Sequence, residues 1–187
     1  MNRCSWAGPN KLMAEYHDKE WGVPLHDDTK LFEFLILEGA QAGLSWQTIL
    51  SKRQNYRKAF NHFNPNKIAK YDSQYIKKLL DNPGIVRNRL KIGAAIINAR
   101  KFIEIREEYG SFGKYMWQFV SHKPMRNQLR SLREIPATSK ESDAMSNALK
   151  KRGFKFVGPT ICYAFMQATG MVNDHFVSCP RYNQIKW

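Results

Sequence analysis

Residues 37–46, Leu-Glu-Gly-Ala-Gln-Ala-Gly-Leu-Ser-Trp, contain an acid in an unusual position. Glu38 falls near the end of an apolar helical pattern that begins at Leu31, where the helix macrodipole disfavours negative charge. A carboxylate so placed is either tolerated at the surface or kept for a ligand, and the residue types alone favour the surface. The helix leads into a small elbow, in which Gly43 precedes the apolar side chain of Leu44.

A second set of reactive side chains is divided between the two ends of the chain: Cys4, His17, His175 and Cys179. Two cysteines and two histidines are a common closed set of tetrahedral zinc ligands. Spacing alone leaves a zinc site and a group of buried thiols and packed histidines equally open. A closed site has no position for water, so any metal held here would be structural.

A third group is the basic segment 148–160, which joins two helical patterns through a turn that contains Gly153. The first backbone N–H groups of the helix after Gly158 are free and carry the positive end of its dipole, which suits phosphate. Basic side chains surround this turn: Lys150, Lys151, Arg152 and Lys155. The segment therefore favours a grip on a nucleic-acid backbone, although an ordinary helical hairpin with solvated lysines would look similar.

The elements that must position these residues are predicted to be helices, so the fold class is all-α. Helices are expected over about 11–18, 46–60, 86–109, 112–120, 144–151 and 160–169, with shorter ones opened by Asn64-Pro65 and by Ser73. Asp27 or Asp28 is expected to cap the helix that carries Glu38, Ser45 the next one, and Ser142 or Asp143 the helix before the hairpin. Lys52, Arg53 and Lys58 are expected to form a basic flank on 46–60. No run with the period of a strand is longer than a few residues.

The length and charge of the chain limit the classes of fold and of binding partner that are expected. A chain of 187 residues is predicted to form a single domain, 1–187. Its formal charge of +14 attracts polyanions, nucleic acid before membrane. No apolar run approaches membrane-spanning length, and the N-terminus lacks the apolar core of a signal peptide. Three cysteines do not suggest a disulfide framework and fit a reducing cytosol, and Cys162, on an apolar helix face, is predicted to lie in the core.

The hairpin and the segment Val172-Asn173-Asp174-His175-Phe176 resemble the helix-hairpin-helix superfamily of DNA glycosylases. Longer motifs resemble the small bacterial 3-methyladenine DNA glycosylase I family, and the resemblance spans almost the whole chain. They are Arg3-Cys4-x-Trp6, Tyr16-His17-Asp18-x-Glu20-Trp21-Gly22-Val23-Pro24, the stretch 37–46, Lys150 to Val157, and Val172 to His175. The resemblance implies a helix-hairpin-helix at about 143–170. It also implies one structural Zn²⁺ per chain, held by Cys4, His17, His175 and Cys179, that staples residues 1–26 to 171–187.

The resemblance also implies an activity. Such an enzyme flips 3-methyladenine out of alkylated double-stranded DNA and hydrolyses its N-glycosidic bond without lyase activity, releasing free 3-methyladenine. It implies a monomer in the bacterial cytoplasm, on nucleoid DNA. Glu38 would be the catalytic, base-recognising acid within an aromatic pocket of Trp6, Tyr16, Trp21 and Trp46, because stacking and cation–π forces hold a cationic purine. Leu44, with Gly43, would fill the vacated gap in the duplex, and Lys155 and Gly158 would contact its backbone.

Several positions depart from the patterns. Phe156 stands where the hairpin usually has a glycine, Asn173 stands where the superfamily has a catalytic aspartate, and Met13 stands where relatives often have an aromatic residue. Thr160 replaces the lysine of the lyase branch, so β-lyase activity is not expected. Two alternatives stay open: a non-catalytic, zinc-stapled DNA-binding module, and a glycosylase for a different lesion. The base released from methylated DNA would distinguish them.

Overall fold

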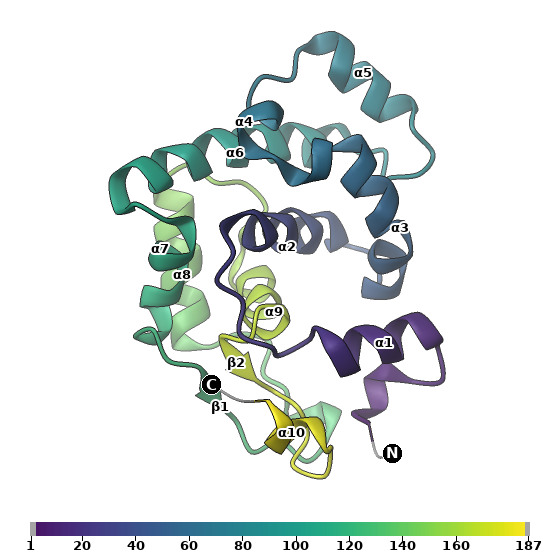
Figure 1. Cartoon of the computed structure of the whole chain (residues 1–187), viewed down its shortest axis with the longest axis vertical. Helices are drawn as coiled ribbons and strands as arrows, with labels where there is room; N and C mark the ends of the chain where they lie inside the picture. Colours follow the sequence, from purple (N-terminus) through teal and green to yellow (C-terminus); the bar gives the residue numbers. More distant parts are fainter. Residues whose placement is uncertain (1–2, 186–187) are drawn as a thin grey trace.

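The computed structural model describes residues 3–185, and helices make up most of it (Figure 1). The predicted all-α class is confirmed. The α-helices are α1 (Lys11–Lys19), α2 (Asp28–Gln41), α3 (Trp46–Ala59), α4 (Pro65–Ile68), α5 (Ser73–Asp81), α6 (Arg89–Tyr109), α7 (Phe112–Trp117), α8 (Lys140–Lys151), α9 (Pro159–Ala168) and α10 (Arg181–Gln184). Short 3₁₀ turns are η1 (Ser5–Ala7), η2 (Asn61–Phe63), η3 (Gln118–Val120) and η4 (Leu132–Glu134). Within residues 3–185, no helix has both the length and the apolar character that crossing a membrane requires.

The helix α2 is the centre around which the others pack. It contacts α3, α6, α7 and α9, and Figure 1 places it between α6 and α9. Every residue from Leu31 to Ala40 is buried, so this helix has no solvent-facing side over that length. Asp27 caps its first turn, as predicted, by accepting a hydrogen bond from the Lys30 amide at 2.8 Å.

Some of the predicted helix caps are confirmed by the structure and others are not. Ser45 caps α3, and Gly110 ends α6 in the left-handed conformation. The predicted cap of α8 at Ser142 or Asp143 is wrong, because α8 begins earlier and Ser139 caps it. Ser142 completes a capping box, in which its hydroxyl accepts from the Ser139 amide at 2.8 Å.

One other helix start is shifted, and one is as predicted. Helix α6 begins at Arg89 rather than near Val86, because Asn88 caps it and the Val86 amide donates to the Tyr56 hydroxyl at 3.2 Å. Helix α5 begins at Ser73, as predicted, and Asp72 caps it by accepting a hydrogen bond from the Tyr75 amide at 2.8 Å.

The C-terminal segment after α9 contains two short regular elements. The strand β2 (Val172–Asn173) pairs in parallel with β1 (Met125–Arg126), and α10 follows. Two-residue strands have no detectable period, so the sequence could not indicate them. The pair lies at the end of the molecule where α1 and α10 also lie (Figure 1).

Arg53 is buried, contrary to the prediction of an exposed basic flank on α3. Its guanidinium donates to Glu33 of α2 at 2.5 Å and to Glu20 at 2.7 Å. Glu33 also accepts from Arg57 at 2.8 Å. These ion pairs tie α3 to α2 and to the end of α1, the elements that carry the candidate site.

Candidate active site

A cavity of about 310 Å³ lies where η1, α1, α2 and α3 meet α9, within the size range of small-molecule sites. All five residues predicted to recognise a base line it, although they are spread over 41 positions of the sequence: Trp6, Tyr16, Trp21, Glu38 and Trp46. The structure therefore brings the predicted set together around one hollow.

Glu38 lies in the last full turn of α2, which continues to Gln41, and only 4% of it is exposed. The surface position that residue types alone favoured is wrong, because α2 is enclosed along its length. Burial raises the pKa of the Glu38 carboxyl to about 8. A cationic ligand in the cavity would favour the ionised form and lower this pKa again.

The aromatic residues form the walls of the cavity. The ring centroids of Trp6 and Trp21 are 4.8 Å apart at 70°, and those of Tyr16 and Trp46 are 5.4 Å apart at 50°. The indole N–H groups of Trp6 and Trp46 are buried and have no hydrogen-bond partner among residues 3–185. Burial and the charge of Glu38 hold the pKa of Tyr16 well above its usual value, so the phenol keeps its proton.

Six further residues line the cavity: Met13, Gln41, Leu132, Ile135, Ala164 and Gln167. Met13 supplies the wall where an aromatic residue was expected. Gln41 follows Glu38 by three positions on α2, so helical spacing could have indicated it. Leu132 and Ile135 come from the connection 122–140, which reads as polar. Leu132 is 48% exposed, and its signal in the sequence is the three-residue spacing of Leu129, Leu132 and Ile135 within that connection.

The elbow, residues 42–45, follows α2 beside the cavity. Gly43 has φ +77°, a left-handed conformation that suits glycine. Leu44 is 42% exposed, so it is not packed inside as a helix-start contact. The Leu44 amide donates to the Gln41 carbonyl at 2.6 Å, which folds the elbow back on the end of α2.

The hairpin, residues 152–158, joins α8 to α9. Gly158 precedes Pro159, the first residue of α9, and the Lys155 side chain is exposed, as a backbone grip requires. Arg152 does not contribute as predicted, because its guanidinium pairs with Glu108 of α6 at 2.7 Å. Phe156 has φ +53°, so it occupies the left-handed conformation that explains the usual glycine.

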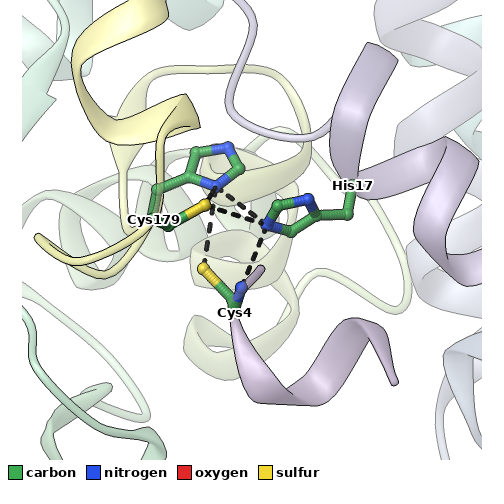
Figure 2. A group of neighbouring side chains, drawn as sticks. Cys4, His17 and Cys179 are labelled. Carbon is green, nitrogen blue, oxygen red and sulfur yellow. Dashed lines mark hydrogen bonds between the residues drawn. The ribbon is translucent and has the colours of Figure 1, made fainter. Parts of the chain in front are cut away.

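Cys4, His17, His175 and Cys179 form a buried cluster, as predicted from the two ends of the chain. Figure 2 shows Cys4, His17 and Cys179 pointing toward one another. His17 Nε2 and His175 Nδ1 are 3.1 Å apart, Cys179 Sγ lies 3.6 and 3.8 Å from these two nitrogens, and Cys4 Sγ lies 3.7 Å from His175 Nδ1. All four ligand atoms lie within 4.8 Å of one another. A tetrahedral zinc ion with bonds of about 2.0–2.3 Å spaces its ligands by about 3.3–3.8 Å, so small movements of these atoms would let all four reach one ion.

The outer contacts of the cluster also suit a metal. His17 Nδ1 lies 2.8 Å from an Asp18 carboxylate oxygen, and His175 Nε2 lies 3.0 Å from the Trp21 carbonyl. Such contacts fix which ring nitrogen faces a metal. Arg3 pairs with Asp18 at 2.8 Å, so the outer contact is itself held.

The two polar residues before His175 are fully engaged in structure. Asn173 donates to the Tyr182 carbonyl at 3.1 Å and accepts from the His175 amide at 3.1 Å. The Asp174 carboxylate accepts from Asn127, Tyr163 and Gln167 at 2.7–2.8 Å. Asn173 has no carboxylate, and that of Asp174 is occupied by these three hydrogen bonds.

Comparisons with known proteins agree on one family. The family described as methyladenine glycosylase matches residues 6–182. The chain is 51% identical to DNA-3-methyladenine glycosylase 1 of Escherichia coli (strain K12) over 182 residues, 97% of either chain, and 48% identical to a Haemophilus influenzae DNA-3-methyladenine glycosylase over 178 residues, 95% of this chain and 96% of the relative. It superposes with a TM-score of 0.95, at 36% identity and full coverage of both chains, on a Tyr-to-Phe variant of 3-methyladenine DNA glycosylase I in complex with 3-methyladenine. The chain belongs to the methyladenine glycosylase family.

Proposed function

We propose that this chain removes 3-methyladenine from DNA by hydrolysing its N-glycosidic bond. Family membership and relatives named for this activity support the proposal. The observation that carries it in this chain is Glu38, a buried acid whose pKa is raised to about 8, inside a cavity walled by aromatic rings. Such a site fits a flat cation.

The cavity suits the lesion for three reasons. N3-alkylation makes the purine of the nucleotide positive, and the rings of Trp46 and Tyr16 attract a cationic ring by about 1–2 kcal/mol per good contact. The Glu38 carboxylate complements that charge and accepts from the donors of the alkylated base. Unmodified adenine is neutral and lacks the charge that this carboxylate complements, which disfavours its binding relative to the lesion.

The base reaches the cavity only after it has been flipped out of the stack, which costs a few kcal/mol. Leu44, exposed at the tip of the elbow beside the cavity, is suited to fill the gap in the duplex. Lys155 and the free N–H groups after Gly158 would hold the DNA backbone.

The reaction needs little leaving-group activation. The bond from the sugar C1′ to the base breaks, the electron pair leaves with the base, and the cationic purine departs as neutral 3-methyladenine. Water adds to C1′ and releases one proton to solvent. Since Asn173 replaces the usual aspartate and Asp174 is fully engaged by hydrogen bonds, no carboxylate other than Glu38 is assigned a role next to the leaving base.

The test is to incubate the protein with methylated duplex DNA and identify the released base by chromatography. Free 3-methyladenine is expected, and its yield should fall sharply in the Glu38→Gln variant. Release of no base would favour a DNA-binding module, and release of 7-methylguanine or uracil would favour a glycosylase for another lesion.

We further propose that Cys4, His17, His175 and Cys179 hold one structural zinc ion. Their separations are close to those of a tetrahedral site, and the ion would tie η1 and α1 to the segment after β2. The purified protein should contain one zinc per chain, and a chelator should lower its melting temperature. Cys179→Ser should lose the metal, whereas Cys162→Ser, which changes a core thiol on α9, should keep it. Full zinc content in Cys179→Ser would contradict the assignment.

We also propose that the chain acts as a monomer, folded as one domain, on double-stranded DNA in the bacterial cytoplasm. The bacterial relatives and the charge of +14 support this. Light scattering at working concentration should give a mass near 21.8 kDa, and a dimer mass would contradict it.

A further inference from the structure

The elbow and the hairpin are more than 100 residues apart in the sequence, yet both are held by one face of α6. Lys91 and Asn98 lie seven residues apart on this helix, which places them on the same side, about 10 Å from one another along the axis. Lys91 contacts the segment that leads into the elbow, and Asn98 contacts the hairpin.

Lys91 is bonded to the end of α2. Its ammonium donates to the Ala40 carbonyl at 2.8 Å and to the Ala42 carbonyl at 2.6 Å. Carbonyls in the last turn of a helix lack partners within it, and a cation there also suits the helix dipole. Ala42 is the first residue of the elbow, so this ammonium fixes where the elbow leaves α2.

Asn98 holds the hairpin at two points. Its side-chain amide donates to the Lys155 carbonyl at 2.9 Å and accepts from the Lys155 amide at 2.8 Å. Asn98 is only 3% exposed, so both groups of one hairpin residue are satisfied away from solvent. These two hydrogen bonds fix the position of the Lys155 backbone relative to α6, and therefore the point from which its exposed side chain extends.

The two segments also meet directly. A Cβ on Gly39 of α2 would lie 3.2 Å from the Cβ of Phe156, so the hairpin packs closely on the helix turn before the elbow. Lys91, Asn98 and Phe156 all line the small cavity left between these elements. A shift of α6 against α2 would therefore move both DNA-facing segments.

We propose that Lys91 and Asn98 are positioning residues that hold the elbow and the hairpin at a fixed separation, so that both engage one duplex. The inference rests on the proposed function. It differs from a direct phosphate contact by Lys91, because that ammonium already faces two carbonyls of the protein. Only duplex binding needs the two segments together, so free-base binding should not depend on them.

The first experiment compares Lys91→Met with Lys58→Met. Both lose one positive charge, but Lys58 is exposed near the far end of α3 from the elbow. Affinity is measured for a duplex with an abasic-site analogue and for free 3-methyladenine. Lys91→Met should bind the duplex roughly 10-fold more weakly than Lys58→Met, and Lys91→Arg should recover part of this loss. Both variants should bind free 3-methyladenine as the unaltered protein does.

A double-mutant cycle tests whether Lys91 affects duplex binding through the elbow. If Lys91 acts through the elbow, Lys91→Met should weaken duplex binding much less in a Leu44→Ala background. Asn98→Ala tests the hairpin side independently and should also weaken duplex binding while leaving free-base binding unchanged. These outcomes would support the proposal.

Three outcomes would overturn it. They are equal duplex affinity of Lys91→Met and Lys58→Met, an undiminished Lys91→Met effect in the Leu44→Ala background, and a loss of free-base binding in step with duplex binding. Failure of the proposed function would appear differently, as absent release of 3-methyladenine by the unaltered protein.

Discussion

Replacement of Glu38 by Gln tests the role of the buried acid. The variant keeps the size of the side chain and removes its charge. Because hydrogen bonds to a charged group contribute about 1.5–3 kcal/mol, excision of 3-methyladenine should fall roughly 10- to 100-fold at pH 8. Binding to an abasic-site duplex should change little, because no base occupies the cavity there.

The pH dependence of excision gives a second readout. With a pKa of about 8 in the free enzyme, the ionised fraction of Glu38 rises about 50-fold between pH 6 and pH 8. If the carboxylate is the form that receives the cationic purine, kcat/KM should rise over this range and level off above it. The Glu38→Gln variant should show no such rise. Single-turnover excision from a duplex with one lesion, at constant ionic strength, measures both.

The same carboxyl also makes folding stability depend on pH. Its pKa rises from an ordinary 4.5 to about 8 on folding, so between these values the native state holds a proton that the unfolded chain has lost. The free energy of unfolding should therefore fall with pH, by up to about 1.4 kcal/mol per unit. Glu38→Gln should remove this slope and melt at a higher temperature than the unaltered protein at pH 8. Glu15→Gln, which changes an exposed acid on α1, is the control.

Two results would refute this reasoning about Glu38. One is a pH profile of excision that is the same with Glu and with Gln at position 38. The other is a melting temperature for Glu38→Gln that follows that of Glu15→Gln at every pH.

Three further changes test other parts of the structure. Leu44→Ala should weaken abasic-duplex binding about 10-fold, since burying a leucine contributes about 1.5–3 kcal/mol, and an unchanged duplex affinity by fluorescence anisotropy would argue against the wedge. Gly170→Ala should lower the free energy of unfolding by more than 3 kcal/mol, because Gly170 has φ +70° and a Cβ there would overlap the Val23 backbone. Gly110→Ala is the control: Gly110 has φ +78° and no atom within 4 Å of the new Cβ, so the loss should be about 1 kcal/mol. Urea unfolding measures both. Arg53→Met should cost about 3 kcal/mol by the same method because it breaks a buried ion pair, and a loss below 1 kcal/mol, the value for exposed pairs, would contradict this.

The sequence predicted the elements that local chemistry determines. Asp27, Ser45 and Gly110 have side chains or backbone freedom that act within a few residues, so their positions as helix boundaries could be predicted. The start of α8 was missed because Ser139 and Ser142 are equally good caps, and only the structure distinguishes the cap from its partner in the capping box.

Local sequence patterns did not predict contacts between residues that are far apart in the sequence. Arg53 looked like part of an exposed flank because its partners, Glu33 and Glu20, are 20 and 33 residues away. Leu132 and Ile135 reach the cavity from a connection in which Leu129, Leu132 and Ile135 recur every three residues, a spacing that does not indicate what they contact. The aromatic wall and Glu38 were assigned to one pocket from family motifs, since their types alone do not distinguish a pocket from a core.

Several departures from local rules lie close together in this structure. Glu38 is an acid buried at the unfavourable end of a helix, Trp6 and Trp46 bury N–H groups without partners, and Phe156 takes a conformation that suits glycine. All of these lie around the last turns of α2, where the cavity, the elbow and the hairpin converge. Each choice costs stability by itself, and a core designed only for stability would avoid them. A cationic base in the cavity would favour the carboxylate, so the buried acid that opposes folding at high pH is the group that binding would stabilise.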